Sequence, residues 1–425
     1  MSAENTTRPA QPQQGYSGRE RLVTRRCLLV VFLAALCVRG LAGWYAGAAQ
    51  PQEVRYITIA RGILTGQGFT GLDTRFPDII QPPLFPLILS VVQRLPAPDL
   101  AMARGASILL GALLVFPAAA LSRRIFGEQT ARRSAALVAV HPLLVHVSSA
   151  AITESTFTLL VVLGALGIWS GAESPGRRAL APVLGAGLLF GGAFLTRPEG
   201  LAYLAMSLLV LIVVRARQPE ARRDLPILSA CLLGAFVLLV TPYTVWVHAR
   251  LGQWLLAPKA VLVQVHQALV QEGQREMWKE PYGSVLFFER VKFGLNADAT
   301  AIRSHEQFAT AGASLRDGLL VSEEGDVTVS DPGVAARMVA RNLKEFYLET
   351  VKYGYVLPSV IMILAGIGLL SRPWTGRFPQ AALITIAFFL ASFSFLLSHV
   401  ESRFLFTSLP FALPWAAEGW RRTEV

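Results

Sequence analysis

The chain has 425 residues, of which 53% are hydrophobic and only 16% are charged. Soluble domains carry about 25% charged residues, so this composition excludes an ordinary water-soluble protein and indicates a membrane protein. The net charge of +11 comes from arginines in short segments between apolar runs. Nucleic-acid binding needs a clustered basic face, so we expect no nucleic-acid partner. The three cysteines lie within apolar runs and have no metal-ligand spacing.

The N-terminal segment 1–20 is polar and rich in proline and glutamine, which is typical of a disordered tail. Several arginines, ending with Arg25 and Arg26, precede the first apolar run. That run resembles a signal peptide but has no clean small-residue cleavage site, so we interpret it as a retained signal-anchor.

Ten segments are apolar over the roughly 20 residues that a membrane-spanning helix needs, with ends uncertain by several residues. They are 24–44, 104–122, 134–151, 156–171, 180–196, 199–214, 226–247, 354–370, 379–398 and 403–419. The sequence therefore predicts an all-α polytopic membrane protein. Its expected parts are a transmembrane core over 21–248 with a first exterior loop at 44–103, an exterior segment over 249–353, and C-terminal transmembrane helices over 354–425.

Arginines mark every second connection between these segments. Arginine-rich connections stay on the cytoplasmic side, and each predicted cytoplasmic loop has at least two. They contain Arg123, Arg124, Arg132 and Arg133; Arg177 and Arg178; Arg215, Arg217, Arg222 and Arg223; Arg372 and Arg377; and Arg421 and Arg422. The pattern predicts a protein of the bacterial inner membrane with both termini in the cytoplasm and the other connections on the periplasmic face.

Two of the periplasmic connections are long. The first contains the apolar stretches Tyr56–Leu64 and Pro82–Leu95, which are too short to span a membrane and would reverse the arginine pattern if they did. We expect interfacial helices there. The second, over 249–353, is polar and richer in acidic residues, and we expect a small periplasmic subdomain.

Carboxylates and arginines recur together at the periplasmic ends of the predicted helices. These residues are Glu53 and Arg55, Asp73 and Asp78, Glu154, Arg197 and Glu199, and His399, Glu401 and Arg403. Arginine binds phosphate through forked hydrogen bonds, and a carboxylate can accept a proton from an acceptor hydroxyl. A cation can also stabilise a phosphate leaving group. The pattern favours transfer of a sugar from a lipid phosphate.

Four motifs in order resemble a known family. They are QEVRYITIARGILTGQGF (52–69) with QPPLFPLIL (81–89), the run over 122–161, GGAFLTRPEGL (191–201) and ESRFLFTSLPFALP (401–414). Together they resemble the GT-C glycosyltransferases of the protein O-mannosyltransferase and lipid A aminoarabinose transferase kind. The resemblance implies a GT-C bundle of about ten transmembrane helices. It also implies inverting transfer, without a covalent sugar–enzyme intermediate, from a polyprenyl-phosphate donor to a lipid, glycan or protein acceptor.

The same resemblance assigns roles to single residues. Glu53 and Glu154 match the two exterior carboxylates and are the candidate catalytic residues. Gln52 stands where the family usually has the aspartate of an Asp-Glu pair, which makes Glu53 the candidate base. The candidate phosphate-binding residues are Arg55, Arg197 and Arg403. The candidate substrate-binding residues are Gln52, Tyr56, Gln81, Glu199, His399 and Glu401. No cofactor or metal site is predicted. No metal-ligand spacing points to a divalent cation, so the sequence leaves a requirement for one open.

Other interpretations of these residues stay open. Glu154 can be an N-terminal charge that complements the dipole of the following helix, and Glu53 can be a solvated loop carboxylate. A transporter or flippase for lipid-linked saccharides is a second functional class, although no inverted repeat of the kind typical of transporters is visible. An O-antigen polymerase or ligase would keep the chemistry and change the donor to a diphosphate-linked glycan.

Overall fold

The computed structural model describes residues 18–70, 78, 81–251, 313–316, 319–322, 356–371, 378–397 and 406–424, with a few residues within 254–258 and 340–344. The predicted disordered tail therefore lies outside the described residues, except for residues 18–20, which are helical. Most of the predicted subdomain over 249–353 and the candidate residues His399, Glu401 and Arg403 also lie outside them.

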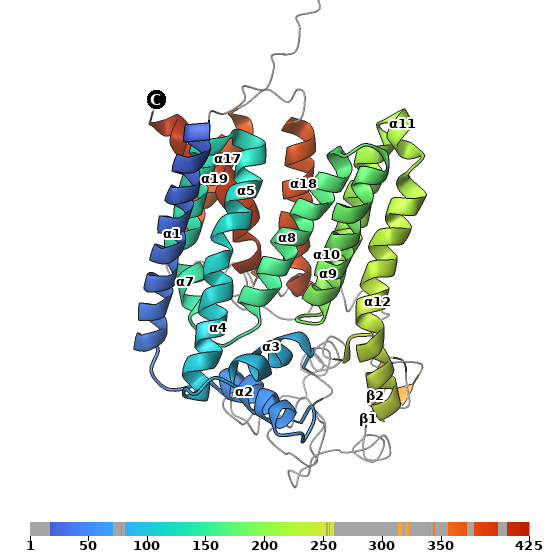
Figure 1. Cartoon of the computed structure of the whole chain (residues 1–425). Coiled ribbons are helices and arrows are strands. Elements are labelled where there is room, and N and C mark those ends of the chain that lie inside the picture. Colours follow the sequence, from blue (N-terminus) through green and yellow to red (C-terminus); the bar gives the residue numbers. More distant parts are fainter. Residues whose placement is uncertain are drawn as a thin grey trace, which may run out of the picture.

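Most of the described chain forms one bundle of upright helices (Figure 1). Its helices are α1 (Gly18–Tyr45), α4 (Asp99–Leu113), α5 (Val115–Phe126), α6 (Glu128–Val140), α7 (Pro142–Ser148), α8 (Glu154–Glu173), α9 (Leu180–Phe194), α10 (Gly200–Ala216), α12 (Leu225–Leu251), α17 (Val356–Leu370), α18 (Phe378–Ala391) and α19 (Leu409–Thr423). Short helical turns are η1 (Gly176–Ala179), α11 (Pro219–Arg222) and η3 (Ser392–Leu397). The strands β1 (Ala313–Arg316) and β2 (Leu319–Ser322) pair as an antiparallel hairpin.

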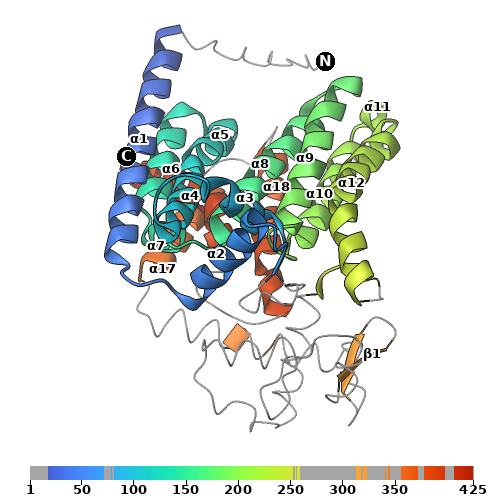
Figure 2. The same ribbon diagram turned by 60° about the horizontal axis from the view of Figure 1, so that its bottom comes forward.

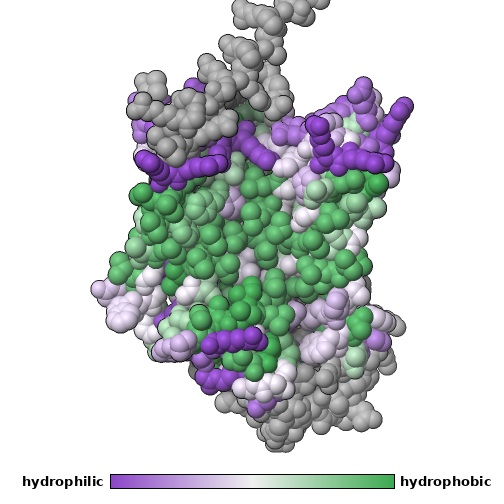
Figure 3. Space-filling model, in the orientation of Figure 1, coloured by the Kyte–Doolittle hydropathy of each residue, from purple (hydrophilic) through white to green (hydrophobic). Residues whose placement is uncertain are grey.

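Each of the ten predicted spans corresponds to one helix or to two consecutive elements. The span 104–122 is formed by α4 and α5, and the span 134–151 by α6 and α7, which are separated at His141. In the described part of the chain, four helical stretches are long and apolar enough to cross a membrane, namely Arg25–Tyr45, Asp99–Phe126 (α4 with α5), Glu154–Glu173 and Leu225–Ala249. Figure 3 shows a broad apolar belt between two polar ends. The predicted helical, polytopic fold is confirmed, with the β1–β2 hairpin as an addition.

Two further helices, α2 (Pro51–Leu64) and α3 (Leu84–Val92), lie across the end of the bundle that carries the predicted periplasmic connections (Figures 1 and 2). With 14 and 9 residues they are shorter than a membrane span. The rings of Tyr56 and Phe85 meet edge to face at 5.2 Å. A small apolar core joins them to Ala103 of α4 and Ala151 of the α7–α8 loop. The two helices therefore form a layer that covers the ends of the transmembrane helices.

The crossing of α17 and α19 depends on two glycines. A Cβ atom at Gly419 would overlap the carbonyl oxygen of Leu364, and one at Gly368 would overlap the carbonyl oxygen of Trp415. We expect Gly419→Ala to lower the free energy of unfolding by about 1–3 kcal/mol, because overpacking forces the two backbones apart. Gly366→Ala, in α17 but with no atom within 4 Å of its Cβ position, is the matched control. Thermal unfolding of the purified chain in detergent should leave the control within about 1 kcal/mol of the unsubstituted protein.

Candidate active site

Three groups of paired carboxylates and arginines lie at the end of the bundle covered by α2 and α3. They are Glu53 with Arg104, Arg55 with Asp78, and Arg197 with Glu154 and Glu199. These residues come from α2, α4, the loop before α3, the start of α8 and the α9–α10 connection. The predicted convergence of exterior carboxylates and arginines is therefore seen for the described members of the set.

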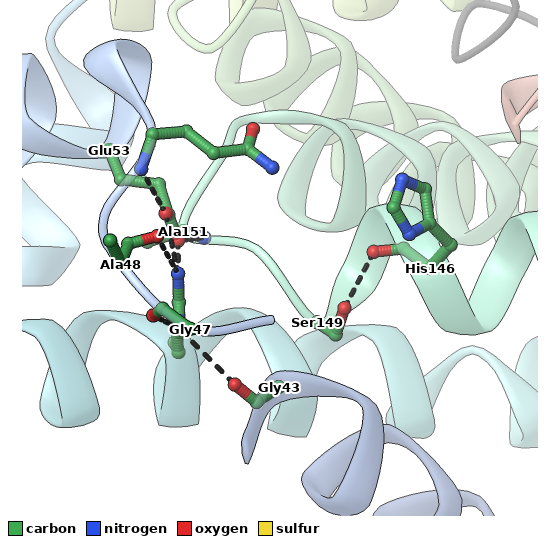
Figure 4. Close-up of polar contacts among 9 residues, drawn as sticks. Gly43, Gly47, Ala48, Glu53, His146, Ser149 and Ala151 are labelled. Carbon is green, nitrogen blue, oxygen red and sulfur yellow. Dashed lines mark hydrogen bonds and ion pairs between the residues drawn. The ribbon is translucent and has the colours of Figure 1, made fainter. Parts of the chain in front are cut away.

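Glu53 is fully buried and accepts four hydrogen bonds (Figure 4). The Nε and Nη2 atoms of Arg104 donate to its two carboxylate oxygens at 2.8 Å each. The backbone N–H groups of Gln50 and Ala151 also donate to it, each at 2.8 Å. Each carboxylate oxygen therefore accepts two hydrogen bonds, and this geometry favours a positioning role for Glu53 over the predicted role as base.

Arg104 was not among the candidate residues. Besides its two bonds to Glu53, its guanidinium donates to the carbonyl oxygens of Gly43, Gly47 and Ala48 at 3.0–3.1 Å. The arginine thereby fixes the end of α1 and the turn into α2. Its sequence signal is modest: it is a charged residue at the first position of the predicted span 104–122, and a buried charge within a membrane protein normally has a partner.

Burial raises the pKa of Glu53, but the Arg104 side chain and the backbone donors Gln50 and Ala151 outweigh burial, so the pKa is lowered below its ordinary value. The ionised carboxylate therefore stabilises the folded chain above the unfolded-state pKa of about 4.3. This contribution is lost as the pH falls through the lower folded-state pKa. We expect thermal stability in detergent to decrease below about pH 4, and to decrease less in the neutral double variant Glu53→Gln with Arg104→Gln. An equal decrease in both proteins would contradict this assignment.

Arg55 and Asp78 form the second group, and both side chains are buried. The Arg55 Nε and Nη2 atoms donate to Asp78 Oδ2 at 2.8 and 2.5 Å. Asp78 Oδ1 accepts the backbone N–H of Gln81 at 3.0 Å. The Gln81 side-chain oxygen accepts the Tyr56 hydroxyl at 3.2 Å. Asp78 belongs to the predicted exterior set of carboxylates and arginines, but the motifs assign no role to it. The structure makes it the partner that orients Arg55 and the Gln81 backbone.

Arg197 is the centre of the third group. Its Nη1 donates to Glu154 Oε1 at 2.6 Å and its Nη2 donates to Glu199 Oε1 at 2.8 Å. The guanidinium also lies over the ring of Phe157, 5.8 Å from the centroid. Burial lowers the pKa of Arg197, but the charges of Glu199 and Glu154 outweigh burial and raise it. Arg197 is therefore held as a cation in one orientation.

The second and third groups are neighbours. The first residue of α3 is attached to the α9–α10 connection by a 2.9 Å hydrogen bond from the Leu84 N–H to the Leu195 carbonyl oxygen. Tyr56, which bonds Gln81, also interacts electrostatically with Arg197. Gln52 lies on the first turn of α2 and is partly exposed. In the described part of the chain, no three His, Cys, Asp or Glu side chains are grouped as metal ligands would be.

Comparisons with known proteins agree with this architecture. Residues 80–246 match the family of dolichyl-phosphate-mannose-protein mannosyltransferases. The structure of ArnT from Cupriavidus metallidurans bound to undecaprenyl phosphate aligns with 96% of this chain, with a TM-score of 0.53 and 15% sequence identity. The oligosaccharyltransferase of Archaeoglobus fulgidus in the apo form aligns with 96% of this chain, with a TM-score of 0.58 and 13% identity. The chain has the GT-C fold.

The GT-C chains that it resembles are longer than this one. The alignments cover 61% of ArnT and 52% of the oligosaccharyltransferase. No curated protein matches the chain by sequence. The GT-C fold expected from the four motifs is confirmed, and the family match covers the segment with Gln81, Glu154, Arg197 and Glu199.

Proposed function

We propose that the chain is a membrane glycosyltransferase that moves a sugar from a polyprenyl-phosphate donor to a glycan, lipid or protein acceptor on the periplasmic face. The observation that carries this proposal is that two oriented guanidinium groups, Arg55 and Arg197, occur at the bundle end beneath α2 and α3 and are connected through Asp78, Gln81 and Tyr56. ArnT, whose fold the chain shares, was solved with undecaprenyl phosphate bound, which supports the choice of donor. The apolar belt beside the site could accommodate a long lipid tail (Figure 3).

Glu154 is the proposed base, because it is the predicted catalytic carboxylate that remains once Glu53 is given a positioning role. Its carboxylate takes the proton of the acceptor hydroxyl as the acceptor oxygen forms a bond to the anomeric carbon. The bond between that carbon and the phosphate oxygen breaks in the same step, which inverts the anomeric centre. The leaving polyprenyl phosphate carries the electron pair away, and Arg197 and Arg55 stabilise its charge.

The remaining candidates have proposed binding roles. Tyr56 and Gln81, which are hydrogen-bonded to each other, are proposed to contact the sugar or phosphate. Glu199 shares Arg197 with Glu154. Gln52 is proposed to face the acceptor, at the position where the family usually has an aspartate. Arg403 is proposed as a further phosphate ligand, and His399 and Glu401 as substrate contacts.

The proposed orientation has a direct test. We expect a single cysteine at Thr65, at the end of α2, to react with a membrane-impermeant maleimide from the periplasmic side of intact cells. A cysteine at Gly127, in the connection between α5 and α6, should react only after the membrane is opened. A background in which Cys27, Cys37 and Cys231 are replaced by alanine is required. The opposite labelling pattern would place the site in the cytoplasm and contradict the proposal.

The activity itself is tested in membranes that contain the full chain. A polyprenyl monophosphate carrying a radiolabelled sugar is supplied, and the label is followed into lipid, glycan and protein fractions. We expect label to move only when the chain is present, and to stop moving in the Glu154→Gln variant. Movement of intact labelled lipid from one leaflet to the other, without transfer of the sugar, would indicate a flippase instead.

A further inference from the structure

Arg39 is a fully buried arginine within the membrane-spanning part of α1. It is not one of the candidate site residues and belongs to none of the three ion-paired groups. An arginine near the centre of a bilayer is expensive unless its donors are satisfied. Its contacts therefore indicate what it does for the fold.

The guanidinium of Arg39 binds the place where α6 ends. Its Nη2 donates to the Val138 carbonyl oxygen at 2.9 Å and its Nη1 donates to the Ala139 carbonyl oxygen at 2.8 Å. In a continuous α-helix the Val138 oxygen would accept the N–H of residue 142. Residue 142 is a proline and has no N–H. Arg39 thus supplies the donor that Pro142 lacks, at a fully buried position that water does not reach.

The same side chain also holds α7. Its Nε donates to the hydroxyl of Ser148, in the last turn of α7, at 2.9 Å. A Cβ atom at Gly111 of α4 would overlap the Ser148 side chain, so α4 packs directly against Ser148. One residue therefore holds the broken helix at the last turn of α6 and at the last turn of α7, and α4 packs against the second of these contacts.

The chain that leaves α7 leads directly into the candidate active site. Ser149 is hydrogen-bonded to the His146 carbonyl oxygen, and two residues later the Ala151 N–H donates to Glu53 (Figure 4). Glu154 follows after three more residues and bonds Arg197. The position of α7 thus sets the positions of both carboxylates that the motifs assigned to catalysis.

We propose that Arg39 is a positioning residue, which compensates for the helix break at Pro142 and so places the α7–α8 loop against Glu53 and Arg197. Its effect on transfer rests on the proposed function. Its effect on the loop does not, and the two are measured separately.

Hydrogen–deuterium exchange of the full chain in detergent measures the loop directly. In Arg39→Met we expect the peptide around Ala151 to exchange about tenfold faster or more, because loss of buried hydrogen bonds loosens the loop. Ser148→Ala removes one hydrogen bond of Arg39 and retains the arginine. The exchange rate of the same peptide should therefore increase less in this variant. This second variant keeps the proposal testable if Arg39→Met does not fold.

Pro142→Ala tests the compensation. Alanine restores the N–H, so the added effect of Arg39→Met on thermal stability and on exchange should be smaller in the Pro142→Ala background. Strictly additive effects of the two substitutions would overturn the compensating role.

Arg215 is the matched control. It is also a buried arginine, and its Nη2 bonds the carbonyl oxygens of Gly171 and Ser174 at the opposite end of the bundle. Arg215→Met should lower thermal stability and leave exchange at Ala151 unchanged. Unchanged exchange in Arg39→Met, or equal acceleration in both variants, would overturn the positioning role. Absence of transfer in the unsubstituted protein would instead contradict the proposed function.

Discussion

Replacement of Arg197 by methionine is expected to lower sugar transfer by at least about a hundredfold, the loss that follows removal of one preorganised donor to a developing negative charge. The physical reason is the orientation of this guanidinium. Two carboxylates and the face of Phe157 fix it as a cation beside Tyr56. Transfer is measured at saturating donor, so that the loss appears in kcat rather than only in KM.

The same substitution has a structural effect that must be separated from catalysis. Glu154 has only 3% of its side chain exposed, and an unpaired buried carboxylate destabilises a protein by about 3–5 kcal/mol. Arg197→Lys keeps the positive charge and loses the planar pair of guanidinium donors. This variant should therefore retain stability and lose most of the activity. The pair Arg197→Met with Glu154→Gln removes both charges and should restore stability without activity. Full activity in Arg197→Lys would mean that a single point charge is sufficient, and would exclude a role for the paired guanidinium donors in transfer.

Glu53→Gln is the second substitution with a large expected effect, and here the two possible roles differ in outcome. The sequence predicts a base, whose loss would abolish transfer without lowering the amount of protein. The four hydrogen bonds of Glu53 instead predict a loss of about 3–5 kcal/mol of stability, because Arg104 is left buried without its counter-charge. Thermal unfolding and transfer are therefore both expected to decline.

The neutral pair Glu53→Gln with Arg104→Gln distinguishes a base from a positioning residue. If Glu53 only positions the turn into α2 and the Ala151 loop, amide–amide hydrogen bonds can replace part of the ion pair, and transfer should recover relative to Glu53→Gln. If Glu53 is the base, the double variant stays inactive even where its stability recovers. Arg104→Gln alone measures how much stability is lost when the Glu53 carboxylate is left without its counter-charge.

The parts of the fold that depend on local hydrophobicity were predictable from the sequence. The ten apolar segments, the basic connections between them and the two non-spanning helices α2 and α3 all follow from the properties of single segments. The division of the span 134–151 was missed, although Pro142 lies inside it. A proline within a helix either kinks or breaks it. The side chain that compensates for the break is that of Arg39, about a hundred positions earlier in the sequence.

The candidate site was predictable as a set of residues and less so as a set of roles. Glu53, Arg55, Glu154 and Arg197 do meet at one end of the bundle. Pairing between helices decides what each can do, and a sequence does not display pairing. Arg104 shows this, because its position at the start of an apolar span gives no sign of the carboxylate that it binds. For the same reason, the motif-based choice of Glu53 as base could not include its four donors.

We propose that the arginines beneath α2 and α3 bind the phosphate of a polyprenyl donor. The most direct measurement is an experimental structure of the full chain in lipid nanodiscs with undecaprenyl phosphate added. We expect phosphate density within hydrogen-bonding distance of the Arg197 or Arg55 guanidinium, with the isoprenoid tail along the apolar belt. Phosphate density at the opposite end, among the arginines between α5 and α6, would contradict this binding site. A structure saturated with this lipid in which the exterior arginines contact only protein would contradict it as well.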